Sequence, residues 1–406
     1  MLSLRTFLPM AVSAVIISAC SAGGGVTPGS SVPAGVAPFS RAHLGNNGAS
    51  KSGGVEFAYV VNQIDNTISA YAVEAQTGAL EPVSGSPFGG RAGQGPNAVT
   101  IDPAGKYVYV TNGFTDNVSV YAISASTGAL KKITGSPFAA GSFPAAVAID
   151  PTGTFAYATN YDSNNVTGYT IDKSTGALSQ MSGSPFAAGT GPGSIVTDPA
   201  GKFAYVGNAG SNNVSAYAID KSTGALKKLS GSPFAAGTTP YDVVIDPSGT
   251  HAYVANYGSN NVSAYAIDKS TGTLKKVSGS PFAAGTSPYG VAIDAAGKFA
   301  YVSNYHSANV SAYAIDASTG ALTSVSGSPF AAGEYPAGIT IDPSGEFSYV
   351  TNFVTGSQEG GAVSASIIDA TGALKKVKGS PFKAGLGAQA VATCAVQSGT
   401  CIPPRL

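Results

Sequence analysis

The stretch YVTN at residues 109–112 recurs, with small changes, along most of the chain. Its copies are Tyr59–Asn62, Tyr109–Asn112, Tyr157–Asn160, Tyr205–Asn208, Tyr253–Asn256, Tyr301–Asn304 and Tyr349–Asn352. Successive tyrosines lie 50 residues apart once and 48 residues apart thereafter. A second marker, Ser-Pro-Phe, has copies that end at Phe88, Phe138, Phe186, Phe234, Phe282, Phe330 and Phe382. Two markers that repeat in step indicate seven copies of one structural unit.

Each repeat has the pattern of four short strands joined by tight turns. In the repeat at residues 289–336, the β-type runs are 291–294, 299–304, 310–316 and 322–330. Glycine, serine, asparagine and aspartate, which favour turns, separate these runs. Four antiparallel strands in a repeat of this length are typical of a β-propeller blade.

The two ends of the repeat array are complementary. Folded sequence begins at the second strand of a blade, residues 55–62, and ends after a single first strand, residues 388–393. That last strand can pair only with the three N-terminal strands. We therefore predict an all-β fold at residues 55–393, a seven-bladed β-propeller of four-stranded antiparallel blades closed by pairing of the N- and C-terminal strands.

The residues before the repeats have the composition of an export signal followed by a tether. The apolar run at residues 7–17 is too short to span a bilayer, and it ends in Ile-Ser-Ala-Cys20. This tetrapeptide resembles the bacterial lipobox, which implies a lipoprotein signal peptide at residues 1–20 and acylation of Cys20. Residues 21–54, rich in Gly, Ser and Pro, are then a flexible tether. The resemblance implies a lipid-anchored envelope protein, at the outer membrane or periplasmic face; an ordinary secretory signal is the alternative.

Two further cysteines, Cys394 and Cys401, lie in the predicted C-terminal tail at residues 394–406. An exported chain meets an oxidising compartment, so we expect a disulfide between them, with free thiols as the alternative. No histidine lies near them to complete a metal site, and we expect neither a metal nor a cofactor.

Positively and negatively charged residues are equal in number, and both are few. Lys plus Arg and Asp plus Glu each total 21, and charged residues make up only 10% of the sequence. Such a composition offers no basic surface for nucleic acid, and it leaves the lipid anchor as the only expected contact with a membrane.

The repeats resemble the YVTN-repeat propellers of the seven-bladed lactonase family over residues 55–393. Besides the YVTN motif, the shared features are the Asp-Pro-x-Gly turns, as at Asp246, and the Ser-Thr-Gly-x-Leu segments. The resemblance implies a carboxylic ester hydrolase similar to 6-phosphogluconolactonase. A phosphorylated substrate needs cationic side chains, yet the four arginines are Arg5, Arg41, Arg91 and Arg405, of which only Arg91 lies within the repeats.

Aromatic residues recur in the loops that join strands two and three and strands four and one. They are Phe114, Phe143, Tyr161, Tyr241, Tyr257, Tyr289, Tyr305, Tyr335 and Phe353. Aromatic faces beside amides and hydroxyls suit a neutral polar small molecule, a glycan or a peptide. We therefore predict ligand binding by Arg91, Tyr161, Tyr241, Tyr257, Tyr289, Tyr305 and Tyr335; the alternative is that the rings pack between blades.

Departures from the repeat supply the candidate catalytic residues. His306 replaces the Gly or Asp of equivalent loops, and Asp242 and Glu334 are acids on the same rim. Arg91 lies in a short insertion before the second blade. Together these residues provide a base, an orienting acid and an anion-binding cation for lactone hydrolysis. The near-identity of several repeats instead favours a binding or scaffold module of the envelope. The sequence leaves open whether the protein is an enzyme.

Overall fold

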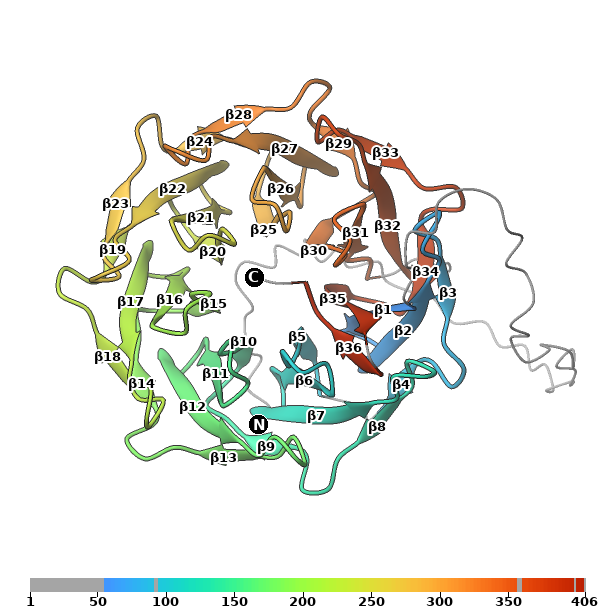
Figure 1. The fold of residues 1–406 in the computed structure, drawn as a ribbon, viewed down its shortest axis with the longest axis horizontal. Helices are drawn as coiled ribbons and strands as arrows, with labels where there is room; N and C mark the ends of the chain where they lie inside the picture. Colours follow the sequence, from blue (N-terminus) through green and yellow to red (C-terminus); the bar gives the residue numbers. More distant parts are fainter. Residues whose placement is uncertain (1–54, 91–93, 356–359, 398, 405–406) are drawn as a thin grey trace, which may run out of the picture. The chain divides into compact units, whose positions relative to one another are not determined.

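The computed structural model describes residues 55–90, 94–355, 360–397 and 399–404. These residues form seven antiparallel β-sheets that follow one another in chain order around a ring (Figure 1). The predicted all-β, seven-bladed propeller is confirmed. Within the same ranges, no helix has the length and hydrophobicity needed to cross a bilayer. The predicted signal peptide, Cys20 and the tether lie outside the described residues.

Every blade repeats the same order of strand positions from the axis outwards, and we name each sheet after the strand at the first position, which we call its innermost strand; the closing sheet has one further short strand, described below. The innermost strands are β5 (Pro96–Ile101), β10 (Pro144–Ile149), β15 (Pro192–Thr197), β20 (Pro240–Ile245), β25 (Pro288–Ile293), β30 (Pro336–Ile341) and β35 (Ala388–Gln397). The second strands are β6 (Tyr107–Asn112), β11 (Phe155–Asn160), β16 (Phe203–Asn208), β21 (His251–Asn256), β26 (Phe299–Asn304), β31 (Phe347–Asn352) and β1 (Glu56–Asn62). The third strands are β7 (Asn117–Ile123), β12 (Asn165–Ile171), β17 (Asn213–Ile219), β22 (Asn261–Ile267), β27 (Asn309–Ile315), β32 (Gly361–Ile368) and β2 (Thr67–Val73).

The predicted fourth strand is two short strands that both pair with the third. The first pieces are β8 (Leu130–Lys132), β13 (Leu178–Gln180), β18 (Leu226–Lys228), β23 (Leu274–Lys276), β28 (Leu322–Ser324), β33 (Leu374–Lys376) and β3 (Leu80–Pro82). The second pieces are β9 (Phe138–Ala139), β14 (Phe186–Ala187), β19 (Phe234–Ala235), β24 (Phe282–Ala283), β29 (Phe330–Ala331), β34 (Phe382–Ala384) and β4 (Phe88–Gly89). Between them the serine of Ser-Pro-Phe replaces a backbone acceptor: the Ser136 hydroxyl accepts a hydrogen bond from the Val120 N–H at 2.9 Å, and the other six blades repeat this bond.

The tyrosine of the YVTN motif ties each blade to the next. The Tyr157 hydroxyl donates to the carbonyl of Gly224, in the turn between the third and fourth strands of the following blade, at 2.8 Å. All seven motif tyrosines make the equivalent bond, and all seven rings are completely buried. The motif therefore sets the contact between blades as well as the strand itself.

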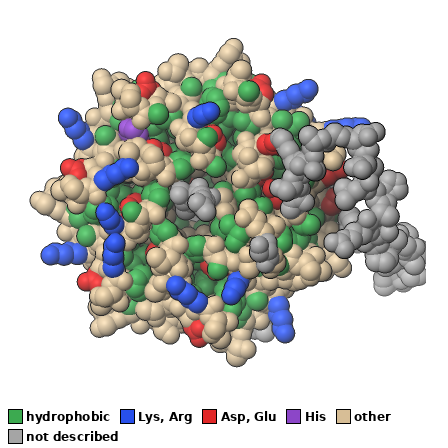
Figure 2. Space-filling view, viewed as in Figure 1, with side chains coloured by type: hydrophobic (Ala, Val, Ile, Leu, Met, Phe, Trp, Pro, Cys, Tyr) green, Lys and Arg blue, Asp and Glu red, His purple; other side chains and the backbone are tan. Residues whose placement is uncertain are grey.

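Lysines mark the outer strands. Both lysines of β8 are exposed, and the same pair occurs in β18, β23 and β33. Charged side chains on an edge strand oppose pairing with a second sheet. On the face seen in Figure 2, the basic side chains are spread over the surface and form no single patch.

The ring closes where the sequence predicts. β1 pairs with β35 in an antiparallel register that sets Phe57 opposite Cys394 and Val60 opposite Val391. β35 runs beyond the predicted boundary to Gln397, and β36 (Thr400–Ile402) then pairs back onto it, so much of the predicted tail belongs to the closing sheet. Cys394 and Cys401 are joined by a disulfide, with their Cα atoms 5.2 Å apart.

Closure also buries one carboxyl beside another. Glu56 of β1 is 8% exposed, and its Oε2 has no hydrogen-bond partner among the described residues. The equivalent positions hold Lys106, Thr154, Lys202, Thr250, Lys298 and Glu346. Burial, and then the neighbouring carboxyl of Asp342, raise the pKa of Glu56 to about 8. Glu56 is therefore mostly protonated at neutral pH.

We expect Glu56→Gln to stabilise the protein at alkaline pH. The folded state keeps the Glu56 proton above the pKa of the unfolded chain, so wild-type stability falls as pH rises from about 4.5 to about 8. The variant has no such loss, and its free energy of unfolding at pH 9 should exceed that of the wild type by more than about 1 kcal/mol. Denaturant unfolding at pH 5 and pH 9 measures this, with Glu81→Gln on the exposed edge strand β3 as control. An equal pH dependence in both variants would contradict the prediction.

Candidate functional site

Two sets of loops meet on one side of the ring and carry the predicted aromatic residues. One set precedes the innermost strands, and the other joins the second and third strands. Backbone hydrogen bonds hold them together: the Tyr257 N–H donates to the Thr239 carbonyl and the Tyr305 N–H to the Ser287 carbonyl, each at 2.9 Å. Thr239 and Ser287 have positive φ angles of 53° and 56°, which turn the chain into the proline that starts each innermost strand.

The aromatic side chains from three adjacent blades pack into one group, which we call the tyrosine cluster. Its members are Tyr241, Tyr257, Tyr289, Tyr305, Tyr335, Phe353 and His306. Ring centroids lie 4.2 Å apart for Tyr241 and Tyr289, and 5.7 Å for Tyr289 and Tyr305. Tyr289 is buried, whereas Tyr335 is 44% exposed, so the cluster extends from the interior to the surface. Five of the six predicted ligand-binding tyrosines lie here, and they also pack on one another.

Tyr161, the sixth, belongs to a second aromatic group in the β5 and β10 sheets. The Phe143 ring lies 6.1 Å from that of Tyr161 and 6.2 Å from that of Phe114. Arg91, the predicted anion-binding residue, lies outside the described residues.

Asp242 occupies an unusual place in this structure. It lies on β20 and is the only Asp, Glu, Lys, Arg or His on the seven innermost strands. Its carboxylate accepts a hydrogen bond at 2.9 Å from the Val291 N–H of β25, in the next blade. Burial raises the pKa of Asp242 to about 6 despite this bond. A carboxylate with a pKa near neutrality is suited to accept a proton from water.

A line of polar groups runs beside Asp242. Gln389 of β35 donates through Nε2 to the Tyr289 hydroxyl, and Tyr289 donates to the Tyr241 hydroxyl at 2.8 Å. Among the described residues, the proton of the Tyr241 hydroxyl has no acceptor. Burial raises the pKa of Tyr241 to about 12 and that of Tyr289 well above its usual value. Both phenols therefore remain protonated at neutral pH and can donate hydrogen bonds.

His306 is more exposed than Asp242. Its Nδ1 is 2.9 Å from the Ser287 hydroxyl and 3.5 Å from that of Tyr257, and its ring packs against Tyr305. Glu334 is exposed in the loop before β30, where its backbone carbonyl accepts a hydrogen bond from Asn352. Within the described residues, no hydrogen bond or ion pair joins Asp242, His306 and Glu334 to one another. The structure brings all three to one side of the ring without forming a triad.

Gln389 and Ser287 are the polar members that sequence reasoning missed. Ser287 takes a loop position at which Phe143, Thr239 and Tyr335 also have positive φ angles, and only its contact with His306 distinguishes it. Gln389 is the one glutamine among small residues at the start of β35, which was a usable signal. In the part of the chain that the structure describes, no group of three or more His, Cys, Asp or Glu side chains is placed to hold a metal ion.

Comparison with solved structures finds the same fold in bacterial proteins of low sequence identity. A candidate 6-phosphogluconolactonase from Bacteroides fragilis superposes with a TM-score of 0.73 at 20% identity, over 85% of this chain and 99% of that one. A periplasmic gluconolactonase from Pseudomonas aeruginosa gives 0.71 at 17% identity, over 84% of this chain and 100% of that one. No curated protein gives a significant match.

Comparison with family models covers most of the chain. Residues 49–186, 179–288 and 279–386 each match the family described as "Lactonase, 7-bladed beta-propeller". Because these segments together span residues 49–386, the chain belongs to the lactonase family of seven-bladed β-propellers.

Proposed function

We propose that the protein hydrolyses a lactone beside the tyrosine cluster, with Asp242 as the general base. The observation that carries the proposal is the single ionisable carboxyl on the innermost strands, with its pKa raised to about 6 by burial. Membership of the lactonase family supports the reaction class. The folds of the two gluconolactonase neighbours are consistent with it, although their identity to this chain is too low to carry a substrate.

Two side chains account for the steps of the reaction. The Asp242 carboxylate takes a proton from a water molecule while the oxygen of that water attacks the lactone carbonyl carbon. The Tyr241 hydroxyl, already bonded to Tyr289, donates to the oxyanion that forms on the carbonyl oxygen. Collapse of this intermediate breaks the ring C–O bond, and the proton held by Asp242 passes to the alkoxide. The product is a hydroxy acid, whose carboxyl group releases its proton to the solvent at neutral pH.

The charges around the site favour a substrate without phosphate. The tyrosine cluster contains no Lys or Arg, so a phosphate group has no permanently charged partner among its members. We expect kcat/KM for D-glucono-δ-lactone to exceed that for its 6-phosphate by at least about tenfold. A pH-stat assay, corrected for spontaneous hydrolysis, compares the two. Preference for the phosphorylated lactone would contradict this prediction, and absence of hydrolysis of any lactone would reject the proposed function.

In the second candidate function, the protein is an envelope-anchored lipoprotein that binds a neutral polar ligand, a glycan or peptide, and catalyses no reaction. It is favoured by the packing of the tyrosines on one another and by the exposed ring of Tyr335. On this hypothesis a lactone binds and is released unchanged. Saturable binding without turnover in the same assay would support it, and mass measurement of the mature N-terminus would test acylation of Cys20.

A further inference from the structure

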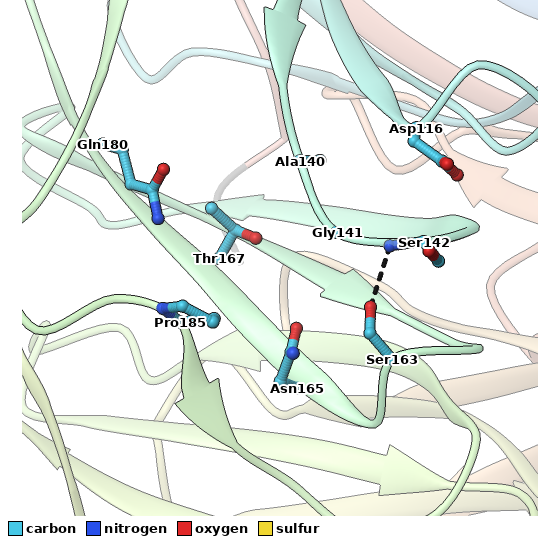
Figure 3. Close-up of a pocket in the computed structure, with 9 residues that line it drawn as sticks. All are labelled: Asp116, Ala140, Gly141, Ser142, Ser163, Asn165, Thr167, Gln180 and Pro185. Atoms are coloured by element: carbon cyan, nitrogen blue, oxygen red, sulfur yellow. Dashed lines mark hydrogen bonds between the residues drawn. The ribbon is translucent and has the colours of Figure 1, made fainter.

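A polar pocket of about 320 Å³ lies in the same two sheets as the second aromatic group. Asp242, on β20, belongs to a different blade. The pocket is formed between the β5 and β10 sheets by Asp116 before β7, Ser142 before β10, Ser163, Asn165 and Thr167 around the start of β12, and Gln180 of β13 (Figure 3). This volume is at the small end of known ligand sites and suits one ring-sized ligand.

Three departures from the repeat meet in this one pocket. Asp116 stands where other repeats have Asn66, Asn164, Asn212 and Asn260. Ser142 stands where others have Thr190, Thr238 and Thr286. Gln180 stands where others have Lys132, Lys228, Lys276 and Lys376, as the pairing of each with the third strand shows. The exchanges shorten one side chain, remove a cation and add a carboxylate at the same place.

The pocket offers hydrogen-bonding atoms of both kinds. Asp116 Oδ1 accepts from the Phe143 N–H at 2.8 Å, and its Oδ2 has no partner among the described residues. Ser163 Oγ accepts from the Ser142 N–H at 2.8 Å, the bond drawn in Figure 3, so its own proton can be donated. Gln180 donates through Nε2 to the Ser184 carbonyl at 3.2 Å, which leaves its amide oxygen as an acceptor.

The second aromatic group lies in the same two sheets as the pocket, and its rings are not among the residues that line the pocket. Phe143 follows Ser142 in the chain and lies between the rings of Tyr161 and Phe114, and Phe114 is 48% exposed. Sugars carry vicinal hydroxyls, which donate hydrogen bonds to carboxylate and amide oxygens and accept them from hydroxyl groups, so they use both kinds of atom in this pocket. A peptide amine would also contact Asp116, but it would make no use of the mixed donors and acceptors around it.

We propose that this pocket is a binding site for one neutral sugar residue, held by Asp116, Ser163 and Gln180. The site is separate from the proposed lactone site and does not depend on it. It would allow the propeller to hold a glycan while the tyrosine cluster remains open.

Calorimetric and saturation-transfer NMR titrations of the full chain with methyl glycosides of common hexoses and N-acetylhexosamines test the proposal. We expect at least one glycoside to bind with a Kd of about 1 mM or tighter. The double variant Asp116→Asn/Gln180→Lys installs the residues of the other repeats, so it should fold normally and bind at least about tenfold more weakly. The matched control is Asn164→Asp/Lys228→Gln, the reverse exchange at the next junction, which should leave this affinity unchanged.

Three results would overturn the proposal. The first is that no glycoside binds at concentrations of about 10 mM. The second is that a glycoside binds equally well to the double variant, which places its site elsewhere. The third is that a lysine-containing peptide binds and depends on Asp116 when no glycoside does, which assigns the pocket to a cationic ligand. Repeating the titration with Asp242→Asn separates this site from the lactone site, since that variant should bind the glycoside as well as the wild type does.

Discussion

Replacement of Asp242 by asparagine is expected to lower kcat/KM for lactone hydrolysis by about 10²- to 10⁴-fold. The asparagine side-chain carbonyl keeps an acceptor for the Val291 N–H, which donates to Asp242 at 2.9 Å, so the β20–β25 contact should survive. What the variant loses is the group that accepts the proton from water. An unchanged thermal unfolding temperature beside the loss of activity would assign the effect to chemistry.

The pH dependence of the wild type should reveal the same group. Asp242 acts as a base only when ionised, and burial raises its pKa to about 6. kcat/KM should therefore rise with pH through about 6 and level off above it, after subtraction of the base-catalysed background. The residual activity of Asp242→Asn should lack this rise.

Two neighbouring variants make the assignment specific. Glu334→Gln changes an exposed carboxyl on the same side of the ring and should leave kcat/KM within about threefold of the wild type. His306→Ala removes a ring that packs on Tyr257 and Tyr305, and we expect it mainly to raise KM. If His306→Ala abolishes turnover while Asp242→Asn does not, the imidazole is the base and the proposed roles are wrong.

The fold could be predicted from the sequence because each repeated residue makes the same contact in every blade. The motif tyrosine bonds to the next blade seven times over, as Tyr205 does to Gly272 at 2.8 Å. Ser-Pro-Phe could be recognised as a repeated marker, but the sequence did not predict that the fourth strand is divided into two pieces there. The serine hydroxyl that stands in for a backbone acceptor, as Ser232 does for the Ala216 N–H, depends on a turn that strand patterns do not reveal.

The sequence predicted which residues belong to the candidate site, but not how they are arranged in space. The loop aromatics were identified because they recur in equivalent loops, and Asp242 because it departs from the repeat. Their grouping was not, because adjacent blades bring together residues 48 apart, such as Tyr241 and Tyr289, whose hydroxyls lie 2.8 Å apart. Gln389 reaches the same network from the far end of the chain only because the ring closes.

Removal of the C-terminal segment from residue 388 onwards is expected to abolish cooperative folding. The truncation deletes β35 and β36, and with them the seven residue pairs that join β1 to β35. It also exposes the paired edge of β1, whose residues are all buried in the intact ring. An unpaired apolar edge favours aggregation over a stable open ring. Circular dichroism during heating and size-exclusion chromatography should show no sharp unfolding transition and an aggregated product.

A milder variant distinguishes the contribution of strand pairing to stability from that of the disulfide. Cys394→Ala/Cys401→Ala keeps β35 but releases the short ring that the disulfide closes, a change worth about 2–3 kcal/mol in the free energy of unfolding. We expect that variant to unfold cooperatively at a lower temperature, and we expect a peptide of residues 388–404 to restore a transition when added to the truncated chain. A truncated chain that unfolds like the wild type would mean that six complete blades hold the ring together without the terminal strand. Loss of folding in the cysteine variant alone would instead make the disulfide, and not strand pairing, the element that closes the propeller.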